Sequence, residues 1–328
     1  MQAHWSEVNI CPMEPEQINA SAVRDADVLI VRTRTKADAQ LLADSSVKMV
    51  CTATIGYDHI DTAYCDAHGI RWISCPGCNA QAVCDYIEEA IEESSNLQIS
   101  NVHTFRSCLQ AKKSQIPTTP VVGVVGVGHV GSLVAAMAER KGMKVLLNDP
   151  PKGIGVSLDE IAKNCDIITF HVPLITNLQL PITNHQYPTY HLCNEAFLKK
   201  CKPSALIINA ARGGVVDEQA LLRSGHPFIL DTWENEPHIN PTAVSKAFRA
   251  SMHIAGYSVE GKRNASQMCL DAISEAFFLP RIDLSECRYI DPSGKQADSS
   301  PGWLSRISDA LKAAPASFET LRKTYPLR

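Results

Sequence analysis

The stretch that decides the fold is "VVGVVGVGHVGSLVAAMAERKGMKVLLND", residues 121–149. An apolar run leads into Gly126, Gly128 and Gly131, which are spaced as G-x-G-x-x-G. Apolar residues at helical spacing follow, and a second apolar run ends at Asp149. A strand, a glycine turn, a helix and a second strand in this order predict a dinucleotide-binding βαβ unit. A glycine-rich turn in some other α/β fold is the alternative interpretation.

The three glycines each have a physical reason in such a unit. The first allows a tight turn, the second lets the backbone approach a pyrophosphate, and the third lets the helix pack closely on the strand. The N-terminus of the helix offers unpaired N–H groups and a positive dipole end to the phosphates. Asp149 stands where an acidic residue bonds the ribose hydroxyls and repels a 2′-phosphate. This predicts NAD rather than NADP, although the nearby Lys152 weakens the preference.

Apolar segments alternate with helix-compatible stretches on both sides of this unit. Continuous apolar character is typical of strands buried on both faces, and the alternation predicts parallel sheets. A polar connection, residues 88–120, separates two α/β series and contains a helix in its first half. A turn-rich linker follows residue 281 and leads into a helical stretch, residues 303–314. The other expected strands are residues 26–33, 47–56, 70–77, 144–149, 166–172, 205–211, 227–233 and 251–256.

The composition excludes several classes of protein. The chain has 328 residues, of which 45% are hydrophobic and 20% charged, with a formal net charge of −4. A nucleic-acid-binding protein would carry a basic, clustered charge, and a membrane span would need a long apolar run. The first residues lack the features of a signal peptide, so we expect a cytoplasmic protein. The spacing of His, Cys and acidic residues does not suggest a metal site.

Candidate catalytic residues follow three of the later strands. Arg212 comes just after the strand at 205–211, Asp231 and Glu236 follow the next strand, and His253 follows the one after that. Open α/β sheets bind ligands at the carboxyl ends of their strands, so these side chains are expected to converge. An isolated histidine at a strand end is usually packed and hydrogen-bonded. The combination of three such residues with the glycine turn favours catalysis.

The order of these motifs resembles the D-2-hydroxyacid dehydrogenase family. The resemblance is carried by the glycine turn and by "NAARGGVVDE" (209–218), "LDTWENEP" (230–237) and "HIAGY" (253–257). A finer resemblance, to the branch that oxidises 4-phospho-D-erythronate in vitamin B6 biosynthesis, is carried by a second set of stretches. These are "VRTRTK" (31–36), "TATIGYDHID" (52–61), "PGCNAQAV" (76–83), "NDPP" (148–151) and "HIAGYSVEGK" (253–262).

The resemblance implies a mechanism. His253 would be the general base that takes the C2 hydroxyl proton as hydride leaves for NAD, giving the 2-oxo product. Glu236 would hydrogen-bond the imidazole, and Arg212 would bind the substrate carboxylate. The finer resemblance implies a phosphorylated 2-hydroxy acid as the substrate. Arg32, Arg34 and Lys36 form a candidate anion-binding loop, and a solvated basic turn is the alternative interpretation.

The resemblance also implies individual contacts and a domain organisation. We expect two Rossmann-like, doubly wound parallel-sheet domains with a cleft between them, and a short C-terminal extension. Residues 1–87 and 257–280 would bind substrate, 88–256 would bind NAD, and 281–328 would be part of a dimerisation extension of a homodimer. Expected substrate contacts are Thr33, Thr54 and Tyr257. Expected NAD contacts are Gly126, Gly128, His129, Val130, Gly131, Asp149, Val172, Ala210, Ala211, Arg212, Asp231 and Gly256.

The chain departs from the family pattern at several places, which keeps two alternatives open. The usual first strand is replaced by "MQAHWSEVNIC", residues 88–120 are unusually polar, residues 174–189 look expanded, and Val172 stands where the branch tends to have Thr. One alternative is a dehydrogenase of another 2-hydroxy acid such as 3-phosphoglycerate. The other is a non-catalytic NAD-sensing protein, which would have no chemical need for Arg212, Glu236 and His253 together.

Overall fold

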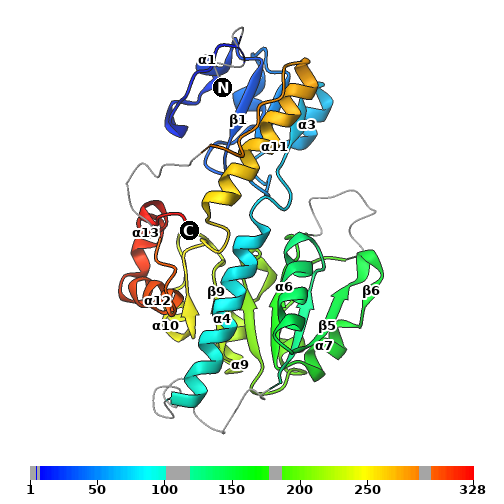
Figure 1. The fold of residues 1–328 in the computed structure, drawn as a ribbon, viewed down its shortest axis with the longest axis vertical. Coiled ribbons are helices and arrows are strands. Elements are labelled where there is room, and N and C mark those ends of the chain that lie inside the picture. Colours follow the sequence, from blue (N-terminus) through cyan, green and yellow to red (C-terminus); the bar gives the residue numbers. More distant parts are fainter. Residues whose placement is uncertain (1–4, 6–7, 101–118, 177–186, 288–296) are drawn as a thin grey trace. The chain divides into compact units, whose positions relative to one another are not determined.

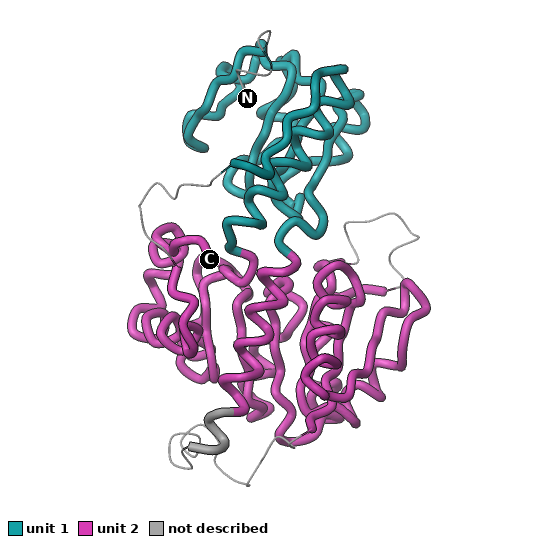
Figure 2. Tube along the Cα trace, in the orientation of Figure 1, with its two compact units in different colours: residues 1–79, 257–294 teal, residues 80–256, 295–328 magenta. Residues whose placement is uncertain are grey.

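The chain divides into two compact units. A computed structural model describes residues 5, 8–100, 119–176, 187–287 and 297–328. Unit 1 comprises residues 1–79 and 257–294, and unit 2 comprises residues 80–256 and 295–328 (Figure 2). The boundary expected after residue 87 therefore lies inside the first helix of unit 2, and the expected extension 281–328 is shared between the units.

Unit 2 is built on a parallel sheet whose strand order places the glycine turn at its switch point. Within the described residues the sheet has seven strands in the order β10-β9-β8-β7-β4-β5-β6. Neighbours are parallel from β10 to β5, and β6 pairs antiparallel with β5. The strands are β4 (Val121–Val125), β5 (Lys144–Asp149), β6 (Ile154–Gly155), β7 (Ile167–Phe170), β8 (Leu206–Asn209), β9 (Phe228–Leu230) and β10 (Arg249–Ala250). Because β4 lies between β5 and β7, the chain direction across the sheet reverses at β4, where open α/β sheets bind ligands.

Helices bury the central strands of this sheet. All residues of β7, β8 and β9 are buried, as expected for strands covered on both faces. One core joins β4 to α4 (Ala80–Ser100) and α6 (His129–Arg140), two helices that lie side by side in Figure 1. The other described helices of unit 2 before residue 250 are α7 (Leu158–Asn164), α8 (Glu195–Leu198), α9 (Glu218–Ser224) and α10 (Pro241–Lys246), with 3-10 turns η2 (Pro150–Lys152) and η3 (Gly213–Val215).

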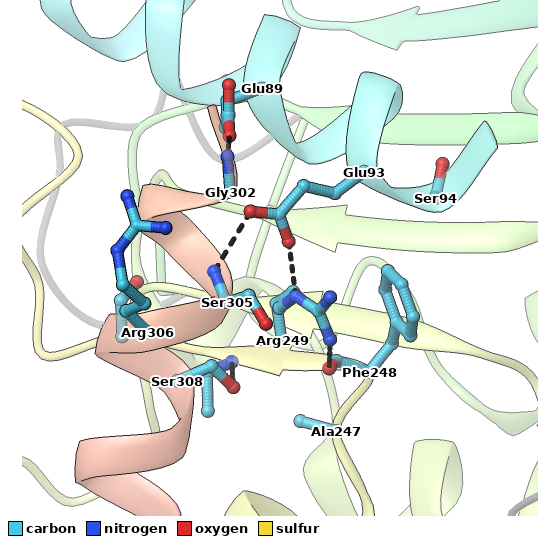
Figure 3. A network of polar contacts seen from close by, with 12 residues as sticks. Glu89, Glu93, Ser94, Ala247, Phe248, Arg249, Gly302, Ser305, Arg306 and Ser308 are labelled. Carbon is cyan, nitrogen blue, oxygen red and sulfur yellow. Dashed lines mark hydrogen bonds and ion pairs between the residues drawn. The ribbon is translucent and has the colours of Figure 1, made fainter. Parts of the chain in front are cut away.

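The segment from residue 303 is an integral part of unit 2. It forms α12 (Trp303–Ala313), η4 (Pro315–Ser317) and α13 (Phe318–Thr324). The Ser308 hydroxyl accepts the Ala250 N–H at 3.0 Å, so α12 covers β10 at the edge of the sheet. The Glu93 carboxylate of α4 accepts the Ser305 N–H at 2.9 Å and also pairs with Arg249 of β10 (Figure 3). Helix α12 is thereby tied to both α4 and β10.

Unit 1 has its own smaller parallel sheet. Its described residues form three strands in the order β1-β2-β3, with Val31 of β1 opposite Thr52 of β2. The strands are β1 (Val28–Val31), β2 (Met49–Thr52) and β3 (Arg71–Ile73), and the helices are η1 (Pro15–Gln17), α1 (Ala20–Val23), α2 (Ala39–Leu42), α3 (Thr62–Ala67) and α11 (Val259–Phe277). Helix α11 belongs to this unit although it follows unit 2 in the sequence, because its apolar side chains share a core with β2.

The structure confirms the predicted alternation of strands and helices and corrects one strand. The strand expected at 251–256 is wrong: β10 ends at Ala250, and the following residues form a loop. His253 in this loop has a φ of +58°, a left-handed conformation that does not occur within a strand. The polar connection 101–118 and most of the segment that looks expanded, residues 177–186, lie outside the described residues.

Candidate active site

The glycine turn between β4 and α6 has the geometry that its sequence predicts. Gly126 has a φ of +92°, and a Cβ on Gly131 would lie 1.9 Å from the Gly126 carbonyl oxygen. The third glycine is therefore needed for the close approach of helix and turn. A Cβ on Gly128 would meet none of the described atoms within 4 Å, so open space lies in front of the second glycine. Gly128 is also the residue from which α6 starts, and the exposed His129 and half-buried Val130 form the first turn of this helix.

Asp149 and Lys152 brace this turn from the end of β5. The Asp149 carboxylate is buried and accepts the Val127 N–H at 2.9 Å. The Lys152 ammonium donates to the Val127 carbonyl at 2.7 Å and lies 3.8 Å from the same carboxylate. Both charged groups thus act on the backbone of the glycine turn, and the negative charge of Asp149 stands beside the N-terminus of α6.

One further predicted contact, Val172, lies beside the glycine turn after β7. A Cβ on Gly126 would come within 2.8 Å of Val172 Cγ1, so Val172 packs directly against the first glycine. The neighbouring His171 bonds Thr169 Oγ1 through Nε2 at 3.0 Å. Desolvation lowers the pKa of His171 and keeps its imidazole neutral.

Asn209 at the end of β8 shapes the loop that carries Arg212. Its side-chain oxygen accepts the Ala211 N–H at 3.1 Å, and its amide group donates to the Arg212 carbonyl at 2.9 Å. Ala210, Ala211 and Arg212 are partly exposed after this buried strand, and Arg212 Nη1 donates to the Ala211 carbonyl at 2.8 Å. The loop therefore presents the arginine at the carboxyl end of β8.

The Arg212 loop touches the turn that carries Glu236. A Cβ on Gly213 would lie 1.9 Å from the Trp233 carbonyl oxygen, so only glycine permits this approach. In the second turn the Trp233 N–H donates to Glu236 Oε1 at 2.9 Å. The two loops, from β8 and β9, are thus packed backbone to backbone.

His253 and Glu236 form a hydrogen-bonded pair. His253 Nδ1 lies 2.8 Å from Glu236 Oε2, and both side chains remain partly exposed. Burial alone would raise the pKa of Glu236, but the hydrogen bond and charge of His253, the Trp233 N–H and the charge of Arg322 hold it below its ordinary value. The carboxylate is therefore ionised at neutral pH. It engages Nδ1 of the imidazole, so Nε2 is the ring nitrogen that does not contact Glu236.

Asp231 holds the loop in which His253 lies. It is 1% exposed, and its carboxylate accepts the N–H groups of Ile254 at 2.8 Å and Ala255 at 2.9 Å. The same carboxylate accepts the Ser251 hydroxyl at 2.6 Å, and the Asp231 carbonyl accepts the His253 N–H at 2.7 Å. The acid predicted as an NAD contact is thus also the framework of the loop that leads to Gly256.

The sequence prediction missed a second layer behind the Glu236 turn. His191 Nε2 lies 2.5 Å from Glu234 Oε1, and the His191 N–H donates to the Gly214 carbonyl at 2.7 Å. The buried Glu218 accepts the Glu234 N–H at 2.5 Å. Burial raises the pKa of Glu218 to about 7, with smaller contributions from the charges of Glu234 and Glu236 and an opposing one from the Glu234 N–H. The only sequence signal for this layer was the placement of Glu218 at the end of the Arg212 motif.

The predicted substrate contacts belong to unit 1. Val31 of β1 lies opposite Thr52 of β2, and Thr33 and Thr54 each come two residues later. Both threonines therefore follow the carboxyl edge of this sheet. Thr33 is exposed, whereas the Thr54 hydroxyl donates to the Gly56 carbonyl at 2.8 Å. Tyr257 is half-buried immediately before α11. In the candidate anion-binding loop, Arg34 pairs with Glu16 at 3.4 Å.

Gly261, part of the "HIAGYSVEGK" motif, has a packing role. A Cβ at this position of α11 would lie 2.8 Å from the Asn79 side chain. The glycine therefore permits the close contact between α11 and the segment around Asn79, which belongs to "PGCNAQAV". Two stretches that carry the finer resemblance thus meet in unit 1.

The residues of unit 2 fit a bound dinucleotide. The open space at Gly128, the N-terminus of α6 and the acid at the end of β5 lie at one edge of the sheet. Among the described residues, no group of three or more His, Cys, Asp and Glu side chains is placed to hold a metal ion. No described helix combines the length and the apolar character of a membrane span.

Comparisons with known proteins agree with this geometry. The D-isomer specific 2-hydroxyacid dehydrogenase NAD binding domain matches residues 103–255. The erythronate-4-phosphate dehydrogenase of Bacteroides fragilis is 41% identical over 93% of this chain and 86% of its own length. That of Porphyromonas gingivalis is 37% identical over 97% of this chain and 87% of its own length.

Solved structures show the same fold. A D-lactate dehydrogenase from Aquifex aeolicus, complexed with NAD and lactic acid, superposes with a TM-score of 0.66 at 24% identity, covering 84% of this chain and 91% of its own. An NAD⁺-bound 3-phosphoglycerate dehydrogenase of Entamoeba histolytica gives a TM-score of 0.61 at 25% identity, covering 81% of this chain and 84% of its own.

Proposed function

The chain belongs to the erythronate-4-phosphate dehydrogenases, within the D-2-hydroxyacid dehydrogenase family, and we propose that it oxidises 4-phospho-D-erythronate at C2 with NAD. The product is the 2-oxo acid, (R)-3-hydroxy-2-oxo-4-phosphooxybutanoate, an intermediate on the route to pyridoxal 5′-phosphate. The observation that carries the proposal is the His253–Glu236 pair, at 2.8 Å, in the unit that contains the glycine turn.

His253 is the general base of the proposed reaction. Glu236 accepts the hydrogen bond from Nδ1, so Nε2 is the nitrogen that takes the C2 hydroxyl proton. The ionised carboxylate stabilises the imidazolium that results. A positioned base of this kind contributes about 10²–10⁴-fold in rate.

The proposed substrate contacts are Arg212 in unit 2 and, separately, three residues of unit 1. The guanidinium of Arg212 offers a planar pair of donors to the substrate carboxylate. Thr33, Thr54 and Tyr257 are the proposed contacts from unit 1, where both threonines follow the carboxyl edge of a parallel sheet. A phosphate needs positive charge nearby, and Arg32, Arg34 and Lys36 in the loop after β1 are the proposed source.

NAD supplies the hydride acceptor when it is bound. On the protein side, Gly126, Gly128 and Gly131 with the first turn of α6 would hold its pyrophosphate, and Asp149 would bind its ribose. Lys152, which the sequence suggested would weaken the preference for NAD, has its ammonium already engaged by the Val127 carbonyl and Asp149. The remaining proposed contacts are His129, Val130, Val172, Ala210, Ala211, Asp231 and Gly256.

A substrate panel tests this proposal. NADH formation would be followed with 4-phospho-D-erythronate, 3-phosphoglycerate and unphosphorylated erythronate. Each assay would be repeated with a different 2-oxo acid that reoxidises tightly held cofactor, and there the 2-oxo product of the tested substrate would be measured in place of NADH. We expect turnover of 4-phospho-D-erythronate above the other two. Activity on 3-phosphoglycerate alone would agree with the proposed mechanism but contradict the proposed substrate. NADH binding without turnover of any of the three would favour an NAD-sensing protein.

We further propose a homodimer in the cytoplasm. The proposal of a dimer comes from the resemblance of residues 281–328 to the start of a dimerisation domain. Light scattering at micromolar concentration should give the mass of two chains, and the mass of one chain would contradict it. Subcellular fractionation of the native host tests the location.

A further inference from the structure

The guanidinium of Arg328 contacts the loop that carries His253. Its Nη2 lies 2.5 Å from the Ala255 carbonyl oxygen, with longer contacts of 3.4 Å to the Ile254 carbonyl and 3.3 Å to the Ala82 carbonyl of α4. Ala255 is buried and Ile254 is fully buried, so these carbonyls need protein partners. A charged donor makes a stronger hydrogen bond to a carbonyl than a neutral one.

Arg328 is itself held by α12. Its Cζ lies 4.3 Å from the centroid of the Trp303 ring, an arrangement typical of cation–π contacts. Trp303 is buried in the core of unit 2, where its ring meets that of Tyr86 edge-on at 5.9 Å. The Tyr86 hydroxyl in turn bonds the Ser251 hydroxyl at 2.8 Å. The aromatic support of Arg328 is thus connected to the first residue of the same loop.

Helix α12 is hydrogen-bonded to its neighbours near both of its ends. The Glu89 carboxylate accepts the Gly302 N–H at 2.8 Å, and Glu93 joins Ser305 to Arg249 (Figure 3). At the other end of the helix, the Lys312 ammonium donates to the Ala247 carbonyl at 2.5 Å. These contacts attach α12 to α4 and to the approach to β10.

Both the N–H groups and the carbonyls of the loop after His253 form hydrogen bonds to side chains. Asp231 accepts the N–H groups of Ile254 and Ala255, whereas Arg328 donates to their carbonyls. His253 has a φ of +58°, a conformation that costs a non-glycine residue roughly 1–2 kcal/mol and persists only where the surroundings enforce it. Asp231 and Arg328 together provide that enforcement immediately after the strained residue.

We propose that Arg328 is a positioning residue for the dehydrogenation: stacked on Trp303, it holds the Ile254–Ala255 peptide groups and thereby fixes the orientation of the His253 imidazole. This role rests on the proposed function, because the reaction gives His253 its task. Trp303 and Arg328 of unit 2 are then part of the active-site framework. Helix α13 also contributes, because the positive charge of Arg322 helps to lower the pKa of Glu236.

The test compares Arg328→Ala and Arg328→Lys with a control, Arg306→Ala. Arg306 lies on α12 and pairs with Asp298 at the surface, so its loss removes a charge from the same segment without touching the loop. Two quantities would be measured in the full chain: amide hydrogen exchange of peptides that contain residues 253–256, and kcat with the KM values for NAD and 4-phospho-D-erythronate.

We expect Arg328→Ala to speed exchange at 254–255 by about tenfold or more and to lower kcat by roughly 10–100-fold, with KM for 4-phospho-D-erythronate within about threefold. Arg328→Lys keeps a donor and should recover part of both losses. Guanidinium chloride at a non-denaturing concentration should restore part of kcat to Arg328→Ala only, with urea as the control. Arg306→Ala should match the parent.

Unchanged exchange and kcat in Arg328→Ala, or equal losses in Arg306→Ala, would overturn the proposal. If Arg328→Ala does not fold, the comparison rests on Arg328→Lys, for which parent-like exchange and kcat would also overturn it. If the parent protein itself does not turn over 4-phospho-D-erythronate, the proposed function fails. Hydrogen exchange still decides whether Arg328 holds the loop, because that measurement needs no substrate.

Discussion

At the scale of single residues, backbone strain gathers around the candidate catalytic pair. In the described part of the chain, the non-glycine residues with positive φ are His191, Asn235, His253 and Phe278. His253 belongs to the candidate catalytic pair, His191 belongs to the layer behind it, and Asn235 lies between Glu234 and Glu236 in the sequence. Left-handed conformations in non-glycine residues are costly and tend to occur where function requires a particular geometry. The concentration of such residues here supports a site whose side chains are oriented by their loops.

Replacing His253 with Ala should remove the base and spare the cofactor site. We expect kcat to fall by about 10²–10⁴-fold, because the proton of the C2 hydroxyl loses its acceptor. The Kd for NADH, measured by its fluorescence, should stay within about threefold. The matched variant Glu236→Gln keeps the ring but loses the anionic partner, so its kcat should lie between those of the parent and His253→Ala. Full activity in His253→Ala would remove the histidine from the mechanism.

Glu218 should make stability depend on pH. Its pKa is raised from 4.5 to about 7, so the folded state keeps the proton at pH values where the unfolded state has released it. The stabilisation is present below about pH 4.5 and is lost as pH rises through about 7, a loss on the order of 1–3 kcal/mol. Glu218→Gln keeps an acceptor for the Glu234 N–H and removes the titration.

Melting temperatures of the parent and Glu218→Gln, compared at pH 5 and pH 8, measure this effect. The parent should lose stability relative to the variant between the two values. Parallel behaviour of the two proteins would show that Glu218 titrates near its ordinary pKa in the folded state.

Sequence reasoning reached some of these residues and missed others for a physical reason. Arg212, Glu236 and His253 each follow a buried strand, so the topology of a parallel sheet brought them to one edge, and the structure does bring Glu236 and His253 together. Their roles stay predictions. His191 and Glu234 are 43 positions apart in the sequence, and no local pattern marks either residue. Contacts between residues so far apart in the sequence can be identified only once the fold is known.

At the scale of elements, the glycine turn is the part that the sequence predicts best. Its requirements are local: a positive φ at Gly126, a close approach at Gly131 and a helix that starts at Gly128. The loop at 251–256 is the opposite case. Its apolar residues have the pattern of a strand, but the hydrogen bonds to Asp231 and Arg328 draw it into a turn. Those partners are distant in sequence, so the prediction of a strand was wrong.

Two alanine substitutions separate folding from binding in the glycine turn. Gly131→Ala places a Cβ against the Gly126 carbonyl and should destabilise unit 2 by roughly 2 kcal/mol or more. Gly128→Ala has room in the structure and should leave the melting temperature nearly unchanged, while the added methyl blocks the pyrophosphate and raises the NADH Kd by about tenfold or more. Thermal melts and NADH titrations measure both. Equal NADH affinity in Gly128→Ala and the parent would argue against a pyrophosphate at this turn.

At the scale of the whole molecule, the division into two units follows from which segments share a core. Helix α11 joins unit 1 through apolar contacts with β2, whereas α12 joins unit 2 through Trp303 and Leu304. The sequence indicated a change of character near residue 281 but could not reveal that 303–328 would cover the edge of the larger sheet. That outcome depends on pairs such as Ser308 with Ala250 and Glu93 with Ser305.

In the proposed reaction, a hydride moves from C2 of 4-phospho-D-erythronate to NAD. The most direct measurement supplies this substrate with deuterium at C2, together with NAD, and determines by mass spectrometry where the label goes. We predict NADH that carries one deuterium, alongside an unlabelled 2-oxo acid. Unlabelled NADH, or labelled substrate recovered unchanged from a protein that binds NADH, would rule out hydride transfer from C2 of this substrate.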